Sequence, residues 1–130
     1  DLCGAGAFGY VIAQGGIGPE LFARIAPIVP VVVLPFLVSS LIQLAQGSRV
    51  VTAVVAGEIL KELPLEPTTL LFSIAAGAFV LSCVSDPYFW LVRETTNSGL
   101  KEALRGYTIP LTLCGLVVFS AVFIRWLFFV

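Results

Sequence analysis

The residues of this chain that could bind and move a solute lie at two polar interruptions of apolar segments. The first interruption consists of Gln46, Gly47, Ser48 and Arg49, and the second contains Asp86. Free backbone N–H groups, amide and hydroxyl side chains and a guanidinium suit a carboxylate or a hydroxyl group. A carboxyl group within an apolar segment suits proton binding and release. We therefore predict substrate binding by the first four residues and proton coupling by Asp86.

Each of the two charged residues also has an interpretation that is structural alone. Arg49 could pair with Asp86 or Glu58, or it could point to the surface. Asp86 precedes Pro87 and could simply cap a surface helix. The residues at 88–92 argue against a surface position for Asp86, because the segment stays apolar and aromatic after the break.

The composition excludes several classes of protein and site. The chain has 130 residues, of which 58% are hydrophobic and 12% charged, with a mean hydropathy of +1.05 and a net charge of −1. An ordinary soluble domain has about 25% charged residues. The chain has no His, and its three cysteines lie singly at Cys3, Cys83 and Cys114. We therefore expect no metal site, no cofactor and no catalytic residue, and we expect the cysteines to be packing residues.

Apolar segments that break midway are typical of transporters, because irregular backbone in a bilayer is tolerated only beside protein or water. The uncharged segment 27–45 would measure about 28 Å as a helix, enough to cross the hydrocarbon core. The segment 50–57, after the break, would measure about 12 Å and could not. These lengths predict a re-entrant hairpin over 27–60. Two ordinary spans with a loop at Gln46 are the alternative.

The predicted fold is all-α: a polytopic membrane protein fragment with a re-entrant helical hairpin and a broken transmembrane helix. We expect helices at 27–45, with possible kinks at Pro30 and Pro35, and at 49–60, 68–84 and 107–129. We expect residues 1–130 to be the C-terminal part of a transporter domain. It would consist of the end of a membrane helix at 1–14, an interfacial helix at 19–25, the hairpin at 27–60, the broken transmembrane helix at 68–92, a cytoplasmic loop at 93–106 and the last transmembrane helix at 107–130. Within the loop we expect a short helix at 100–105.

Three basic residues, Arg93, Lys101 and Arg105, place the 93–106 segment on the cytoplasmic side by the positive-inside rule. The open end of the hairpin and the C-terminus are then expected on the opposite side of a cell (inner) membrane that the protein crosses several times.

Four patches, in the same order along the chain, resemble the gluconate:proton symporter family. They are Gly-Ala-Gly-Ala-Phe at 4–8, Ala-Gln-Gly-Ser at 45–48, Val-Ser-Asp-Pro-Tyr-Phe-Trp-Leu-Val-Arg-Glu at 84–94, and Leu-Arg-Gly-Tyr-Thr at 104–108. The resemblance implies the C-terminal portion of a permease for gluconate or a related small organic acid. By analogy of fold, it also implies the ion-transporter superfamily, with its inverted repeats and re-entrant hairpins. Asp86, Gln46, Gly47 and Ser48 match the family pattern.

The chain departs from the usual family pattern at both interruptions. Cys83, Ser85 and the Pro-Tyr pair at 87–88 stand where members usually have His, Asn and Ser-Gly, and Arg49 stands where a small residue usually follows Gly-Ser. These departures leave the substrate and the coupling ion open.

The combined prediction is part of a secondary active transporter that works by alternating access and proton symport, with sodium as the other possible coupling ion. The expected partners are a small organic anion, the lipid bilayer, the remainder of the parent permease and further copies in a homo-oligomer, but no nucleic acid. A structural or accessory membrane subunit, or a channel, is the alternative. An enzyme is disfavoured because the sequence offers no nucleophile–base or metal constellation.

Overall fold

The computed structural model describes residues 7, 11, 14–16, 20, 23–24, 27–80, 82–83 and 85–129. The segments predicted at 1–14 and 19–25 lie largely outside these residues. The described part is helical and contains no strand, so the all-α prediction is confirmed for it.

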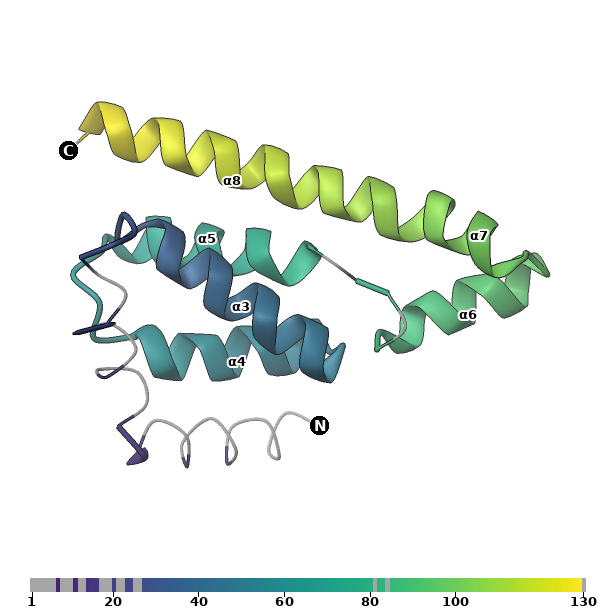
Figure 1. Cartoon of the computed structure of the whole chain (residues 1–130), viewed down its shortest axis with the longest axis horizontal. Coiled ribbons are helices and arrows are strands. Elements are labelled where there is room, and N and C mark those ends of the chain that lie inside the picture. The colour runs from purple at the N-terminus through teal and green to yellow at the C-terminus, as the bar shows by residue number, and fades with distance from the viewer. Residues whose placement is uncertain are drawn as a thin grey trace.

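The helical elements of the described chain follow one another closely (Figure 1). They are α3 (Val33–Gln46), α4 (Arg49–Leu60), α5 (Pro67–Phe79), α6 (Pro87–Thr96), α7 (Leu100–Ala103), the π-helical turn η1 (Leu104–Thr108) and α8 (Ile109–Phe129). The last three form one continuous helix of 30 residues. Within the described residues it is the one helix that is long and apolar enough to cross a membrane.

α5 lies between α3 on one side and α8 on the other. α3 and α5 run in the same direction, whereas α4 returns along α3 and α8 returns along α5 (Figure 1). Apolar side chains of α3, α4 and α5 form the core: Leu34, Val38, Ala56, Leu60 and Ile74. The C-terminus therefore lies at the same end of the molecule as the open end of the α3–α4 pair.

Two glycines allow these helices to approach closely. A Cβ on Gly77 of α5 would collide with the Ser39 side chain of α3. A Cβ on Gly115 of α8 would lie 2.7 Å from the carbonyl oxygen of Ala76 in α5. Small residues at helix contacts are the usual means of close packing in membranes, where lipid provides no hydrophobic driving force between helices.

The first predicted arm, 27–45, is wrong at its start, because residues 27–32 form turns and α3 begins only at Val33. The N–H of Val33 donates to the carbonyl oxygen of Pro30, 2.9 Å away, in the turn that precedes the helix. Pro35 lies in the first turn of α3, where backbone N–H groups have no intrahelical partner. It therefore fits the helix without breaking a hydrogen bond.

The helix predicted at 68–84 ends at Phe79, five residues early, because the backbone adopts an extended conformation at Val80, where ψ is 139°. The segment predicted at 93–106 is more helical than expected: α6 continues to Thr96, and the helix that begins at Leu100, where a short helix was predicted, runs on into α8. Asn97 ends α6 with a left-handed conformation (φ 48°). At the start of α7, the Gly99 N–H donates to Glu102 Oε2 over 3.1 Å. Compact caps of this kind need only three non-helical residues.

Candidate functional site

The turn between α3 and α4 touches the break between α5 and α6. Gly47 adopts a left-handed conformation (φ 72°), and its N–H donates to the Gln43 carbonyl oxygen over 2.7 Å. A Cβ at this position would overlap the Ser85 carbonyl group, so only glycine fits here. The Ser85 hydroxyl donates to the Leu44 carbonyl oxygen over 2.8 Å. The two interruptions thus form one site.

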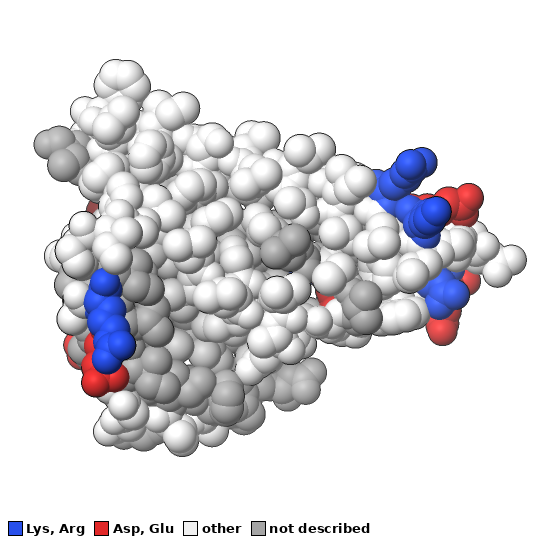
Figure 2. All heavy atoms as spheres, viewed as in Figure 1, with Lys and Arg blue, Asp and Glu red and all other residues white. Residues whose placement is uncertain are grey.

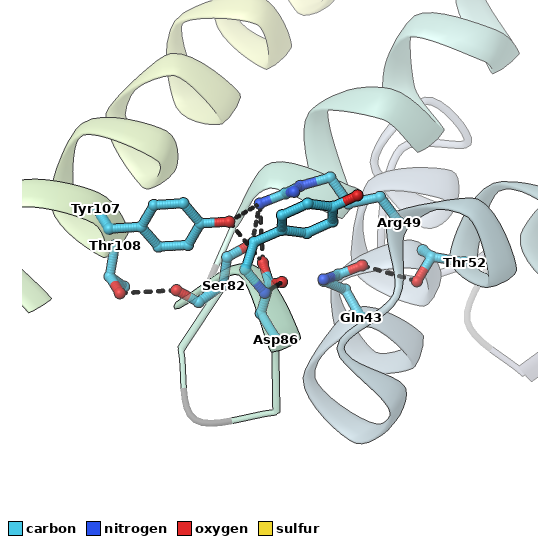
Figure 3. A network of polar contacts seen from close by, with 8 residues as sticks. Gln43, Arg49, Thr52, Ser82, Asp86, Tyr107 and Thr108 are labelled. Carbon is cyan, nitrogen blue, oxygen red and sulfur yellow. Dashed lines mark hydrogen bonds and ion pairs between the residues drawn. The ribbon is translucent and has the colours of Figure 1, made fainter. Parts of the chain in front are cut away.

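Arg49, the first residue of α4, reaches across this contact to Asp86. Its Nη2 lies 2.9 Å from Asp86 Oδ2 and 2.8 Å from Tyr107 Oη, while the Tyr107 hydroxyl donates to the same Asp86 oxygen over 2.9 Å. The Asp86 side chain is 1% exposed and that of Arg49 is 26% exposed. A buried carboxylate is thereby neutralised by a cation at the edge of the site (Figure 3).

The second oxygen of Asp86 caps a helix. Oδ1 accepts a hydrogen bond from the N–H of Tyr88 over 2.9 Å, and Pro87 is the first residue of α6. An Asp cap followed by Pro is a strong helix start, because the side chain satisfies a free N–H and proline needs none. Asp86 is therefore both a cap and an ion-pair partner, and it caps in a buried position.

Aromatic rings surround the guanidinium. The Arg49 Cζ lies 5.5 Å from the ring centre of Phe79 and 5.9 Å from those of Tyr88 and Tyr107. A cation gains electrostatic energy over ring faces at such distances, about 0.5–2 kcal/mol each depending on desolvation. The three rings therefore help to hold the Arg49 guanidinium in the position observed.

Two further polar contacts border the network. The Thr108 hydroxyl donates to the Ser82 carbonyl oxygen over 2.7 Å, which ties the last helix to the break after α5. Thr52 of α4 donates through its hydroxyl to Gln43 Oε1 over 2.9 Å, and both residues are buried. Side chains from α3, α4, the α5–α6 break and η1 thus converge on one place (Figure 3).

The sequence matches the GntP family permease profile over residues 2–128. The chain belongs to the GntP permease family. Among its relatives, it is 27% identical to the high-affinity gluconate transporter of Escherichia coli K12 and 28% identical to the L-idonate transporter of the same strain, over 88% and 89% of this chain. A gluconate permease of Pseudomonas aeruginosa is 32% identical over 86% of this chain.

These alignments cover 28%, 28% and 26% of the three relatives, so the chain spans about a quarter of their length. No solved structure matches the chain. Membership of a permease family confirms the resemblance seen in the sequence, the membrane localisation and the prediction that the chain is not an enzyme.

The structure of this GntP-family chain brings some of the predicted site residues together. Gly47, Arg49 and Asp86 lie in the network. Ser48 is half-buried at the start of α4, and Gln46 is exposed at the end of α3. For Arg49, the alternative of pairing with Asp86 is the arrangement observed. The role of these residues in binding and proton coupling stays a prediction.

Three other members of the network, Tyr107, Gln43 and Thr52, had no predicted role. Tyr107 stood in the resembling patch at 104–108 but received no role, and Gln43 and Thr52 were unremarked polar residues within apolar helices. A polar residue one turn before the predicted hairpin turn was the signal that could have identified Gln43. Among the described residues, no group of three His, Cys, Asp or Glu side chains could hold a metal ion.

Proposed function

We propose that this chain is part of a secondary active transporter that moves gluconate or a related small organic acid across the cytoplasmic membrane by proton symport. The observation that carries the proposal is the Arg49–Asp86 pair, held between two helix breaks in a chain of the GntP permease family. The names of the relatives support a sugar acid as the substrate. An anion and a titratable carboxylate competing for one arginine would couple two solutes directly.

The helix lengths support a re-entrant hairpin and a broken transmembrane helix. With 14 and 12 residues, α3 and α4 measure about 21 and 18 Å, less than the hydrocarbon core of about 30 Å. α5 and α6, with 13 and 10 residues, are about 20 and 15 Å long and meet at the break that contains Asp86. On the face shown in Figure 2, charged side chains gather at the two ends of the long axis, with uncharged surface between them.

The same distribution supports the proposed orientation. The end near the α6–α7 junction carries the basic residues Arg93, Lys101 and Arg105, and we assign it to the cytoplasm. The opposite end holds the open end of the α3–α4 pair, Arg125 and the C-terminus. In this orientation the hairpin enters from the outer side and its turn faces inward, between the charged ends.

The proposed mechanism follows from what Asp86 does to Arg49. While Asp86 is ionised, it neutralises the guanidinium. A proton on Asp86 removes that negative charge, so the guanidinium becomes available to the carboxylate of the substrate. The N-terminus of α4 and the side chains of Gln46 and Ser48 would add hydrogen-bond donors. Gly47 would hold the turn beside the substrate, since its own N–H already donates to the Gln43 carbonyl oxygen. Proton and anion would then be carried together with no net charge in the site.

Transport by the full-length permease that contains this chain tests the proposal. We expect purified protein in liposomes to accumulate gluconate or another member of a panel of sugar acids, hydroxy acids and D-amino acids under an inward proton gradient. A protonophore should abolish accumulation. If accumulation depended on a sodium gradient instead, sodium would be the coupling ion. If no acid were taken up, a structural or accessory subunit would be favoured. Residues 1–130 by themselves should not transport, since their broken helices need neighbours.

A further inference from the structure

We infer that Gln43 is a substrate-binding residue, whose side-chain amide donates a hydrogen bond to a hydroxyl oxygen near the carboxylate of the transported acid. The inference rests on the proposed function. It adds to the network a residue that contacts a hydroxyl group of the substrate rather than its carboxylate. It starts from the only buried amide side chain of α3, one turn before Gly47.

Gln43 is 1% exposed, yet its Nε2 has no hydrogen-bond partner among the described residues. Buried polar groups in proteins nearly always have partners, and an exception calls for a specific explanation. The Arg49 Nε is also buried without a partner in the described part of the chain. Two donors without acceptors at one site are complementary to a ligand rich in oxygen.

The orientation of the amide is set by its other end. Thr52 donates its hydroxyl to Gln43 Oε1 over 2.9 Å, so the oxygen is occupied and the nitrogen points the other way. Figure 3 shows the oxygen end facing Thr52 and the nitrogen end facing the Asp86 side of the site. Both Asp86 oxygens already accept hydrogen bonds, from Arg49 and Tyr107 at Oδ2 and from Tyr88 at Oδ1. The Gln43 amide therefore presents its nitrogen, a donor without a partner among the described residues, to the Asp86 side of the site.

This geometry divides the recognition of a sugar acid between two residues. A cation suits the carboxylate, and a neutral N–H donor suits a hydroxyl oxygen without adding charge to the site. A site built to hydrogen-bond a substrate hydroxyl also rejects analogues that lack it, because its buried donor is then left unpaired. Gln43 would therefore distinguish hydroxy acids from simple carboxylates.

The test measures dissociation constants of the purified full-length permease for gluconate and for its 2-deoxy and 3-deoxy analogues. Gln43→Leu should weaken gluconate binding about 10- to 100-fold. For the analogue that lacks the contacted hydroxyl, Gln43→Leu should weaken binding by less than about threefold, since that analogue cannot make the hydrogen bond with either protein. Ser73→Ala is the matched control, because Ser73 Oγ is likewise buried and unpartnered among the described residues but lies outside the network, in α5. It should bind gluconate as the unmodified protein does.

The melting temperature without substrate separates binding from folding. Gln43→Leu also leaves the buried Thr52 hydroxyl without its acceptor, so this temperature should fall, but only by the few degrees that the loss of one buried hydrogen bond costs. A protein still fully folded at the assay temperature shows that weaker binding is not unfolding. Gln43→Asn, whose shorter side chain retracts the amide, should weaken binding in the same direction. The inference is overturned if both variants bind gluconate normally, or if all three ligands weaken equally. Should the unmodified permease bind none of the acids, the proposed function fails and the inference fails with it. Normal gluconate binding by the variants overturns the inference alone.

Discussion

In the part of the chain that the structure describes, two arginine–carboxylate pairs join distant helices, at nearly the same distance but with different exposure to solvent. Arg49 and Asp86 lie 2.9 Å apart, with side chains 26% and 1% exposed. Arg125 and Glu66 lie 2.8 Å apart, with side chains 45% and 56% exposed. The first pair sits where two helix breaks meet, and the second links α8 to the start of α5 at the end of the molecule.

Exposure to solvent, rather than the distance between the two charged groups, decides how much such a pair contributes to stability. An exposed pair contributes about 0–1 kcal/mol, because water solvates both ions nearly as well when they are apart. Removing one partner of a buried pair costs about 3–5 kcal/mol, because the other charge remains without solvent. Arg49 additionally lies over the rings of Phe79, Tyr88 and Tyr107, and it donates to the Tyr107 hydroxyl. The buried pair is the one whose charge state a substrate or a proton could change.

The largest expected effect comes from Arg49→Ala in the full-length permease. The substitution removes the proposed carboxylate ligand and leaves Asp86 buried without its cation, so proton-driven gluconate uptake should fall at least about 100-fold. Arg49→Lys should restore only part of the activity, since an ammonium cannot reproduce the planar guanidinium. Initial uptake rates in proteoliposomes, normalised to the amount of protein, measure the effect. Uptake within about twofold of normal in the alanine variant would remove Arg49 from the site.

Asp86→Asn should give the next largest effect and separates coupling from binding. Asparagine keeps the shape and can still cap α6, but it carries no titratable proton. We expect pH-gradient-driven accumulation to be lost, about 10-fold or more, while exchange of gluconate across the membrane continues. If Asp86 is only a cap, both activities should persist. Unchanged proton-driven uptake at normal membrane levels would exclude Asp86 as the proton carrier.

Gly47→Ala tests whether the contact between the two breaks creates the buried pair. A left-handed alanine costs about 1–2 kcal/mol, and its Cβ would also push the α3–α4 turn away from Ser85. We expect a lower melting temperature and an uptake reduced about 10-fold, because Arg49 and Asp86 would be moved apart. Gly57→Ala in α4 is the control, since nothing lies within 4 Å of a Cβ built there. Equal behaviour of the two variants would contradict the proposed role of the contact.

The sequence predicted the polar breaks well and the packing around them poorly. The bounds of α4, Arg49–Leu60, agree with the predicted 49–60, because the left-handed Gly47 ends α3 and the extended Ser48 directly precedes α4. The participation of Tyr107 depends on α8 returning along α5, which no local pattern encodes. Likewise, α6 continues to Thr96, past the predicted end of the span at 92, and ends at the left-handed Asn97. Asparagine tolerates this conformation but does not require it, so the sequence does not fix the end of the helix.

The smallest effect is expected from Arg125→Gln, which breaks the exposed pair. Glutamine keeps much of the length and the polarity of the side chain, and Glu66 remains solvated at the end of the molecule. The loss of stability should be about 0–1 kcal/mol and should vanish at high salt, which screens exposed charges. Gluconate uptake should stay within about twofold of normal, because neither residue contacts the network around Asp86. Melting temperatures at low and high salt, read beside uptake rates, provide the measurement. A loss of transport comparable to that of Arg49→Ala would show that the two pairs act together, and that burial does not separate a functional ion pair from a structural one in this chain.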